Sequence, residues 1–443
     1  MKSFKGGIHP ASSKSSSFPQ FYSKIEAAEL PSKVVIPLHQ HIGTPAKPVV
    51  EVGDEVKKGQ KIGEATGFVS ANVHSSISGK VVQLARHLYP ALGRSSMALV
   101  IESDGKDEWH ESIKPYDPEK LANQEIIDMV MESGIVGMGG AGFPTHVKLS
   151  IPEVKKVDTI ILNGVECEPY ITSDYALMIE KPEAIIDGLK IIIRVTGAGR
   201  AYLCIEENKP EAIRIMQRFT QYDKNINVIP LRVKYPQGWE NILAKAILDI
   251  EIPPSKIPLD FGIVISNVST ACAISDAIRY GYPLIERVVS INGSGIKKFR
   301  NLRVRIGTLF SDLIEQCGGF LDTPGKVIAG GPMMGFSMSD IDVPVCKATN
   351  NILVLSKNDT SIREAQTCIR CGRCINVCPA GLMPRIIALL AQKGKFREID
   401  KYFPLDCKEC GCCAYVCPAK IPLVQLIQFA KTDAVARRRK LST

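Results

Sequence analysis

The 443-residue sequence contains no apolar run long enough to cross a lipid bilayer. Its most apolar helical stretch, residues 184–195, is interrupted by Asp187, Lys190 and Arg194. The first residues also lack the apolar segment of a secretory signal, so we expect the chain to stay in the cytoplasm unless it docks on a partner. In that reducing compartment the 14 cysteines are not expected to form disulfides.

The composition also lacks any strong bias. Hydrophobic residues make up 45% and charged residues 23%, which excludes global disorder, collagen and coiled coil. The length predicts about three domains, at roughly 150 residues each. The net charge of +9 permits weak attraction to nucleic acid, anionic lipid or an acidic partner, but a solvated surface is the better explanation. The one compact basic run, Arg437 to Lys440, could touch anionic lipid or be a solvated terminus.

Nine of the cysteines form two matching runs between Cys368 and Cys417. Both runs read C-x2-C-x2-C-x3-C-P, which is the spacing of ferredoxin-type [4Fe–4S] ligands. The alternative, structural zinc, usually takes four ligands as two C-x2-C pairs. When two such runs pair, the fourth cysteine of each binds the cluster of the other run. We therefore assign Cys412 as a non-ligand, and the two clusters to Cys368, Cys371, Cys374 and Cys417, and to Cys407, Cys410, Cys413 and Cys378.

Residues 117–280 alternate between helical and strand patterns. The predicted strands cover residues 157–163, 201–206, 227–231 and 262–266, and the predicted helices cover 117–132, 173–195, 210–221, 239–248 and 271–280. This alternation predicts a mostly parallel sheet with helices on both faces. Binding sites in such sheets lie beyond the carboxyl ends of the strands. Polar residues follow all four strands there, at 163–169, 206–207, 234–238 and 266–270.

A glycine-rich stretch precedes the first of these strands and contains G-x-G-x-x-G at Gly137, Gly139 and Gly142. A helix precedes it where a dinucleotide fingerprint needs a strand, so a plain turn is the alternative. Four glycines in six residues nevertheless let backbone N–H groups approach an anion or a flat ring closely. Phe143 could stack on that ring, and Lys148 could meet a phosphate.

The stretch from Gly137 to Lys148 resembles the flavin loop of the NADH-binding flavoprotein subunit of respiratory complex I, and residues 163–169 and 266–270 are similar to later motifs of that subunit. The resemblance implies FMN and NADH as ligands. It implies FMN contacts for Gly137, Gly139, Gly140, Lys148, Asn163, Glu166, Glu207, Ser266 and Asn267, and NADH-facing positions for Phe143, Glu168, Lys234 and Tyr235. Two positions depart from the pattern, since Val165 replaces an Asp and Ser266-Asn267 replaces an Asn pair.

The whole chain most resembles the C subunit of the Rnf complex, a membrane-bound ferredoxin:NAD oxidoreductase that pumps ions. The opening Gly6-Gly7-Ile8-His9-Pro10 and the order of modules carry this resemblance. It implies a multidomain α/β protein with an N-terminal β barrel-sandwich module (1–112), a Rossmann-like FMN/NADH domain (113–284), a β-grasp module (285–357), a helical two-[4Fe–4S] ferredoxin-like domain (358–431) and a basic tail (432–443).

Residues 49–63 and 73–82 resemble the two halves of a biotinyl or lipoyl domain. A carrier domain presents a modifiable lysine between its halves, where this chain has Ser70-Ala71-Asn72. We therefore expect a structural β module without a prosthetic group.

The resemblance implies an oxidoreductase subunit in which hydride passes between NAD and FMN, and single electrons pass between FMN and two [4Fe–4S] clusters. We assign no general acid or base. We expect peripheral attachment to the cytoplasmic face of the cell membrane, other subunits of the complex as partners, no nucleic acid and no transmembrane segment. Two alternatives stay open. One is a soluble cobalamin reductase, although in those proteins the glycine motif lies near the N-terminus. The other is a non-enzymatic adaptor without a working flavin, supported only by Val165.

Overall fold

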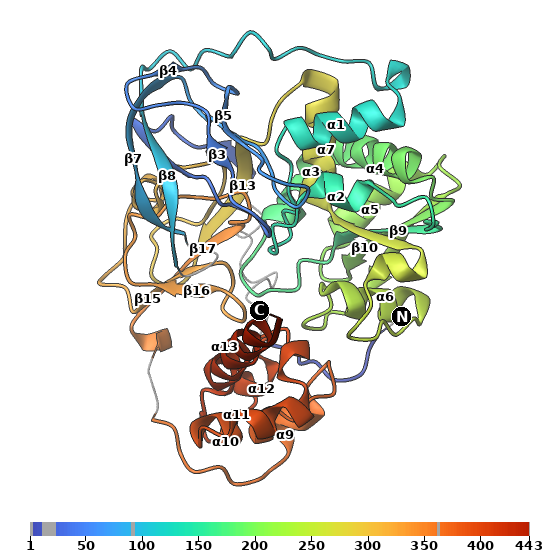
Figure 1. The fold of residues 1–443 in the computed structure, drawn as a ribbon, viewed down its shortest axis with the longest axis vertical. Coiled ribbons are helices and arrows are strands. Elements are labelled where there is room, and N and C mark those ends of the chain that lie inside the picture. The colour runs from blue at the N-terminus through green and yellow to red at the C-terminus, as the bar shows by residue number, and fades with distance from the viewer. Residues whose placement is uncertain (1–2, 11–23, 90–93, 361–363, 443) are drawn as a thin grey trace.

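The computed structural model describes residues 3–10, 24–89, 94–360 and 364–442 (Figure 1). They form a multidomain α/β protein, as predicted. We call its parts the N-terminal module (33–103), the central domain (118–280), the third module (286–355) and the cysteine segment (364–442). Figure 1 shows the cysteine segment as a separate helical lobe below the other three parts.

The N-terminal module contains two small sheets with strand orders β2–β8–β7–β4 and β3–β5–β6, and the paired strands of both sheets run antiparallel. Its core is built from β-branched and Leu side chains such as Ile36, Ile62 and Leu99, all fully buried. Its strands are β2 (Lys33–Pro37), β3 (Lys47–Pro48), β4 (Glu55–Val56), β5 (Lys61–Glu64), β6 (Val73–His74), β7 (Gly79–Tyr89) and β8 (Arg94–Ser103).

The central domain has a four-stranded parallel sheet in the order β11–β10–β9–β12, which confirms the predicted sheet type. Its strands are β9 (Thr159–Gly164), β10 (Arg200–Glu206), β11 (Ile226–Leu231) and β12 (Ile263–Asn267). Its helices are α1 (Asn123–Glu132), α2 (Thr145–Leu149), α3 (Ser173–Glu180), α4 (Pro182–Thr196), α5 (Pro210–Thr220), α6 (Glu240–Leu248) and α7 (Val268–Tyr280).

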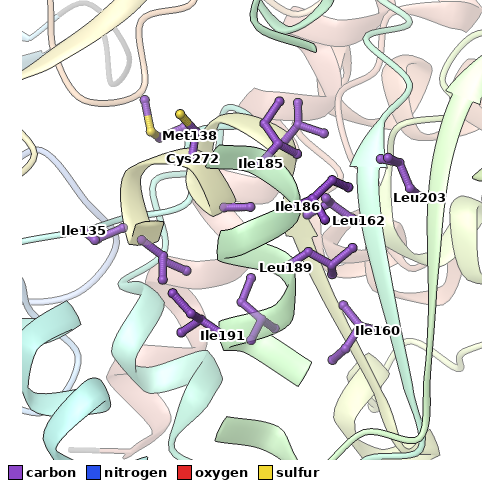
Figure 2. Packing of buried hydrophobic residues seen from close by; sticks show 14 of the residues in the cluster. Ile135, Met138, Ile160, Leu162, Ile185, Ile186, Leu189, Ile191, Leu203 and Cys272 are labelled. Atoms are coloured by element: carbon purple, nitrogen blue, oxygen red, sulfur yellow. The ribbon is translucent and has the colours of Figure 1, made fainter. Parts of the chain in front are cut away.

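Alternate residues of the central strands serve two separate cores, because successive side chains of a strand point to opposite faces. Leu162 of β9 packs with Leu189 of α4 in one core, as Figure 2 shows. Ile161 packs with Leu243 of α6 in the other. Helices therefore cover both faces of the sheet. The edge at the carboxyl ends of the strands remains as the place for a binding site.

Two predicted helices of the central domain are divided in the structure. The predicted helix 173–195 breaks at Lys181 (φ −129°, ψ 41°), because the following Pro182 disfavours helical backbone at that residue. The predicted helix 117–132 becomes a 3-10 turn, η2 (Pro118–Lys120), followed by α1 from Asn123. Here the Arg194 guanidinium donates to the carbonyl oxygens of Pro118 and Leu121, and the Pro118 oxygen also accepts the 3-10 hydrogen bond from the Leu121 N–H.

The third module is a six-stranded mixed sheet in the order β1–β14–β13–β17–β15–β16. Its edge strand β1 (Ile25–Ala27) precedes the N-terminal module in sequence and pairs in parallel with β14. The remaining elements are β13 (Glu286–Asn292), β14 (Arg300–Arg305), α8 (Phe310–Gln316), β15 (Lys326–Ala329), β16 (Phe336–Met338) and β17 (Asn351–Leu355). The module is thus completed by chain from outside its own sequence range.

The cysteine segment repeats one backbone pattern. Arg370 and Gly372 of the first run have φ of 56° and 74°, and Glu409 and Gly411 of the second have 57° and 79°. Its helices are α9 (Arg373–Asn376), α10 (Pro384–Gln392), α11 (Phe396–Ile399), α12 (Cys412–Tyr415) and α13 (Leu423–Ser442). Within the described ranges, no helix combines the length and apolarity needed to span a bilayer.

Candidate functional site

The carboxyl ends of the central strands bring polar residues together, as the parallel order requires. Asn163 of β9 and Asn267 of β12 are register partners. The Asn267 side-chain amide donates to the Asn163 carbonyl oxygen at 3.4 Å, and the Asn163 amide donates to the Gly238 carbonyl oxygen at 2.9 Å. The loops after β9, β11 and β12 therefore form one hydrogen-bonded edge.

Asp174, near the start of α3, orients this edge and was missed by sequence reasoning. Its carboxylate accepts from the Asn267 amide at 2.7 Å and from the Ser269 hydroxyl at 2.6 Å. Its own backbone N–H donates to Glu166 at 2.7 Å. The signal in the sequence was an acidic residue in the first turn of a helix that follows a site loop. Asp174 thus links predicted FMN residues on two loops.

The glycine loop stands over this edge. It is closed by the Gly137 N–H, which donates to the Phe143 carbonyl oxygen at 2.8 Å. The Met138 N–H donates to the Thr270 hydroxyl at 2.9 Å, which fixes the loop to the start of α7. Gly140 is exposed with φ of 122°, and a Cβ built there meets no protein atom within 4 Å. The backbone therefore presents an open face, which fits a flat ring such as that of FMN.

The other side of the loop is held by two neighbouring modules. The Ile42 N–H of the N-terminal module donates to the Gly142 carbonyl oxygen at 3.0 Å. Lys347 of the third module is fully buried, and its Nζ donates to the carbonyl oxygens of Gly134 at 2.6 Å and Asn72 at 2.7 Å. Burial lowers the pKa of Lys347 to about 7. One lysine thus joins three parts of the chain behind the loop.

The predicted cations have different surroundings. Lys148 Nζ lies 2.5 Å from Glu240 Oε1 and donates to the Ile265 carbonyl oxygen at 3.1 Å, near the carboxyl end of β12. Lys234 turns toward the start of the chain, where its Nζ donates to the Phe4 carbonyl oxygen at 2.6 Å. Desolvation lowers the pKa of Lys234. Of these two predicted residues, Lys148 is the one held at the strand edge.

The remaining predicted residues also differ in placement. Ser266 is half-buried and directly precedes Asn267, whereas Glu207 is exposed beside the buried Glu206. Of the predicted NADH-facing residues, Phe143 is half-buried in the glycine loop. The Glu168 carboxylate accepts from the backbone N–H groups of Met333 and Met334, at 3.2 and 2.8 Å. Tyr235 is 1% exposed. Glu168 and Tyr235 therefore lie at contacts between parts of the chain.

The cysteines fall into two groups that mix the two runs. Four of the predicted ligands, Cys378, Cys407, Cys410 and Cys413, line one pocket together with the predicted non-ligand Cys412. We call them the inner group, because Trp239 of the central domain lines the same pocket. Cys374 packs against Cys417; burial raises its pKa, and the nearby charges of Cys371 and Cys417 act in the same direction. We call the other four predicted ligands, Cys368, Cys371, Cys374 and Cys417, the outer group; of these, Cys371 is exposed.

The donor sets fit iron–sulfur clusters chemically. Each group offers four thiols, the number that a [4Fe–4S] cluster takes. Backbone N–H groups support the sulfurs, with Leu382 donating to Cys378 at 3.3 Å and Glu409 donating to Cys407 at 3.4 Å. Cys412 is buried and hydrogen-bonded to Cys410, which lowers the pKa of Cys410. Across the described ranges, no three His, Cys, Asp or Glu side chains gather tightly enough to hold a single metal ion.

Four family descriptions match successive parts of the chain. They are the RnfC Barrel sandwich hybrid domain over residues 2–106, the Nuo51 FMN-binding domain over 130–276, the SLBB domain over 288–337 and the 4Fe-4S dicluster domain over 360–418. The match at 130–276 contains the glycine loop and the strand edge. The match at 360–418 contains both cysteine groups.

Curated relatives match nearly the full chain. The C subunit of the proton-translocating ferredoxin:NAD(+) oxidoreductase complex of Clostridium ljungdahlii is 47% identical, over 99% of this chain and 96% of its own length. The Na(+)-translocating counterpart of Acetobacterium woodii is 44% identical, over 99% and 98%. The C subunit of the ion-translocating oxidoreductase complex of Rhodobacter capsulatus is 43% identical, over 97% and 82%.

A solved structure shares the fold. A chain of the NAD+-reducing [NiFe]-hydrogenase in the air-oxidised state superposes with a TM-score of 0.50 at 17% identity. The match covers 71% of this chain and 61% of the hydrogenase chain.

Proposed function

The chain belongs to the family of C subunits of Rnf ion-translocating ferredoxin:NAD(+) oxidoreductase complexes, and from that premise we propose how its residues divide the work. It is an electron-transfer subunit with FMN and two [4Fe–4S] clusters as cofactors and NAD(H) as substrate. One observation carries the proposal. The same chain holds a glycine loop over the edge of a parallel sheet and the two groups of cysteines. The two sites are joined by the hydrogen bond from Tyr235 to Cys410.

The glycine loop and the strand edge are proposed to bind FMN. Bound FMN would exchange hydride with NAD(H) and single electrons with the clusters, a conversion between two-electron and one-electron chemistry. The backbone at Gly137, Gly139 and Gly140 lets a ring approach, and Asn163 and Asn267 supply hydrogen-bonding groups at the edge. We assign the remaining FMN contacts to Lys148, Glu166, Glu207 and Ser266. Phe143, Glu168, Lys234 and Tyr235 stay proposed NADH-facing residues, although Glu168 and Tyr235 also serve contacts between modules.

The two cysteine groups are proposed to act in series. The inner group shares a pocket with Trp239 of the central domain, so its cluster would exchange electrons with the flavin site. The outer group includes the exposed Cys371, beside Ile369, which is 68% exposed. Its surroundings also carry the exposed Arg370 and Arg373. This mixed apolar and basic face suits a partner protein with an acidic surface.

We propose that the subunit attaches peripherally to the cytoplasmic face of the membrane through the other subunits of its complex. Relatives of nearly equal identity belong to a proton-translocating and a Na(+)-translocating complex. Overall identity in this subunit therefore does not distinguish the two ions.

The two alternatives lose their support. The cobalamin reductase alternative does not account for Rnf-type relatives that match over 99% of the chain. The adaptor alternative rested on Val165, which is fully buried and packs in the core with Leu243. The valine at position 165 therefore packs in the core beneath the carboxyl edge of the sheet.

The function is tested on protein purified without oxygen from membranes that contain its neighbouring subunits. We expect flavin and iron–sulfur absorbance bands together, about eight iron atoms per chain, and reduction of both chromophores by NADH. Zinc in place of iron, or the absence of flavin, would contradict the proposal.

The partner face is tested by Ile369→Glu, with Val154→Glu as control, since Val154 is 93% exposed in a loop of the central domain. A charge in an apolar contact should weaken partner binding by about tenfold or more. We expect Ile369→Glu to keep its iron and its reduction by NADH, while less protein is recovered with membranes. Equal recovery of both variants would place the partner elsewhere.

A further inference from the structure

Residues 4–9 lie far from the N-terminal module that they precede in sequence. Figure 1 draws this segment in dark blue between the central domain and the cysteine segment. Phe4 and Ile8 are buried, at 7% and 5% exposure. A segment with two buried apolar side chains is part of the packing between those two bodies.

On one side the segment binds the central domain. Ile8 and Tyr235 form an antiparallel bridge, with N–H to carbonyl hydrogen bonds of 2.8 and 2.9 Å in the two directions. The Lys234 ammonium lies 4.4 Å from the centre of the Phe4 ring and donates to the Phe4 carbonyl oxygen. His9 Nδ1 is 2.9 Å from the Val233 carbonyl oxygen. Three successive residues, 233 to 235, are therefore held by the segment.

On the other side the segment binds the inner cysteine group. The Gly7 N–H donates to the Val377 carbonyl oxygen at 2.9 Å. A Cβ at Gly6 would lie 3.0 Å from the Cys378 carbonyl oxygen. Tyr235 completes the contact, because its hydroxyl donates to the Cys410 carbonyl oxygen at 2.7 Å. Both Cys378 and Cys410 belong to the inner group.

Gly7 is the position that permits this close arrangement. Its φ is 74°, and a Cβ there would lie 2.6 Å from the Tyr235 carbonyl oxygen and 2.8 Å from the Phe4 ring. Contacts below 3.0 Å to backbone atoms require the chain to move. Any side chain at Gly7 therefore displaces the segment from the Tyr235 backbone, from the Phe4 ring, or from both.

We propose that residues 4–9 form a strap that fixes the spacing between the flavin site and the inner cysteine group, with Gly7 and Tyr235 as positioning residues for electron transfer between them. The inference rests on the proposed function. One electron leaves the reduced flavin and one cluster gains it, so no other reactant is needed. Because the rate of such a transfer falls steeply with distance, displacing the strap should slow this step more than hydride exchange with NAD(H), in which the neighbouring Lys234 and Tyr235 are also proposed to take part.

The test compares Gly7→Ala with Gly105→Ala in the full chain. Gly105 has a matching φ of 76°, is exposed, and a Cβ there meets nothing within 4 Å. Both variants should keep wild-type flavin and iron contents, and Gly105→Ala should also keep wild-type flavin reduction by NADH. In Gly7→Ala, flavin reduction by NADH should be slowed less than cluster reduction. Gly7→Ala should slow cluster reduction, followed by rapid-freeze electron paramagnetic resonance, by roughly tenfold or more. Gly105→Ala should not slow it.

A second measurement tests whether the strap is in place and does not depend on enzyme activity. Hydrogen exchange at the Ile8 and Tyr235 amides should be slow in the wild type and faster in Gly7→Ala, because both amides bond across the bridge. Tyr235→Phe, which keeps the ring and loses the bond to Cys410, should leave this exchange slow and slow cluster reduction less than Gly7→Ala does.

An unchanged rate of cluster reduction in Gly7→Ala would overturn the strap proposal. Loss of iron in that variant would also overturn it, because the segment would then be needed for folding. A wild-type protein without flavin or iron would instead overturn the proposed function.

Discussion

The Tyr235 hydroxyl donates a 2.7 Å hydrogen bond to the carbonyl oxygen of Cys410. The tyrosine follows β11 of the central domain, and Cys410 belongs to the inner cysteine group. Burial raises the pKa of Tyr235 far above its usual value, and the nearby Glu168 adds to this effect, so the hydroxyl remains a donor at every working pH. This hydrogen bond between the two parts is thus independent of pH.

Cluster ligation should cross between the two cysteine runs. If Cys378 and Cys407 serve one cluster, each single change to Ala should remove about half of the roughly eight iron atoms, and the double change no more. Cys378→Ala combined with Cys371→Ala should remove nearly all of it. Cys412→Ala should keep both clusters, because Cys412 lies outside the C-x2-C-x2-C-x3-C spacing. Iron analysis measures all of these variants. Additive loss in the Cys378 and Cys407 pair would contradict the crossed assignment.

A side chain at Gly140 should exclude the flavin. The protein leaves open space there, so Gly140→Val would project into the volume assigned to the ring. We expect the purified variant to lose flavin absorbance and NADH oxidation and to keep its iron. Gly53→Val is the matched control, with φ of 107° and the same open space, in the N-terminal module. Full flavin content in Gly140→Val would show that the loop does not face the ring.

Stability should rise with pH between about 7 and about 10 because of Lys347. Burial lowers its pKa to about 7, against about 10.4 in the unfolded chain. Between these values the unfolded chain binds more protons, so the free energy of unfolding increases with pH. Below about 7 both states are protonated, and the contribution is constant. The neighbouring His41 and His74 have pKa values lowered mainly by burial, to about 4 for His41, so they titrate at lower pH.

Lys347→Met should flatten this rise, as measured by denaturant unfolding at several pH values. The exposed Lys120→Met should leave it unchanged. A rise of equal slope in Lys347→Met would mean that another group is responsible.

The basic tail should contribute more to packing than to lipid attachment. Arg437 forms ion pairs with Asp400 and Asp433, each at 2.6 Å. Exposed pairs of this kind stabilise by at most about 1 kcal/mol each. Arg437→Ala should therefore lower the stability of the cysteine segment slightly, and deleting residues 437–443 should change membrane recovery little. High salt should release the protein only partly, because salt screens charge but not apolar contact. Complete release by salt would assign attachment to charge.

The parts of the site that could be predicted from the sequence are those that short stretches of chain determine. Asn163 and Asn267 follow buried strands, and parallel strands bring their carboxyl ends to one edge, so their proximity could be expected. Asp174 was missed because its contacts to Asn267 and Ser269 cross about a hundred residues of sequence. The break at Lys181 was readable from Pro182, whereas the late start of α1 depended on Arg194, a distant competitor for helix carbonyls.

The sequence by itself determined the chemistry of the thiols, because three of the four proposed ligands of each cluster lie within a few residues of one another and their spacing is local. It also determined the parallel sheet, since helix and strand periods are properties of short segments. Only the tertiary structure decided that Tyr235 and Glu168 lie at module contacts, that Lys347 supports the glycine loop, and that residues 4–9 bridge two bodies. Those arrangements depend on which distant surfaces bury each other, and no local pattern encodes that choice.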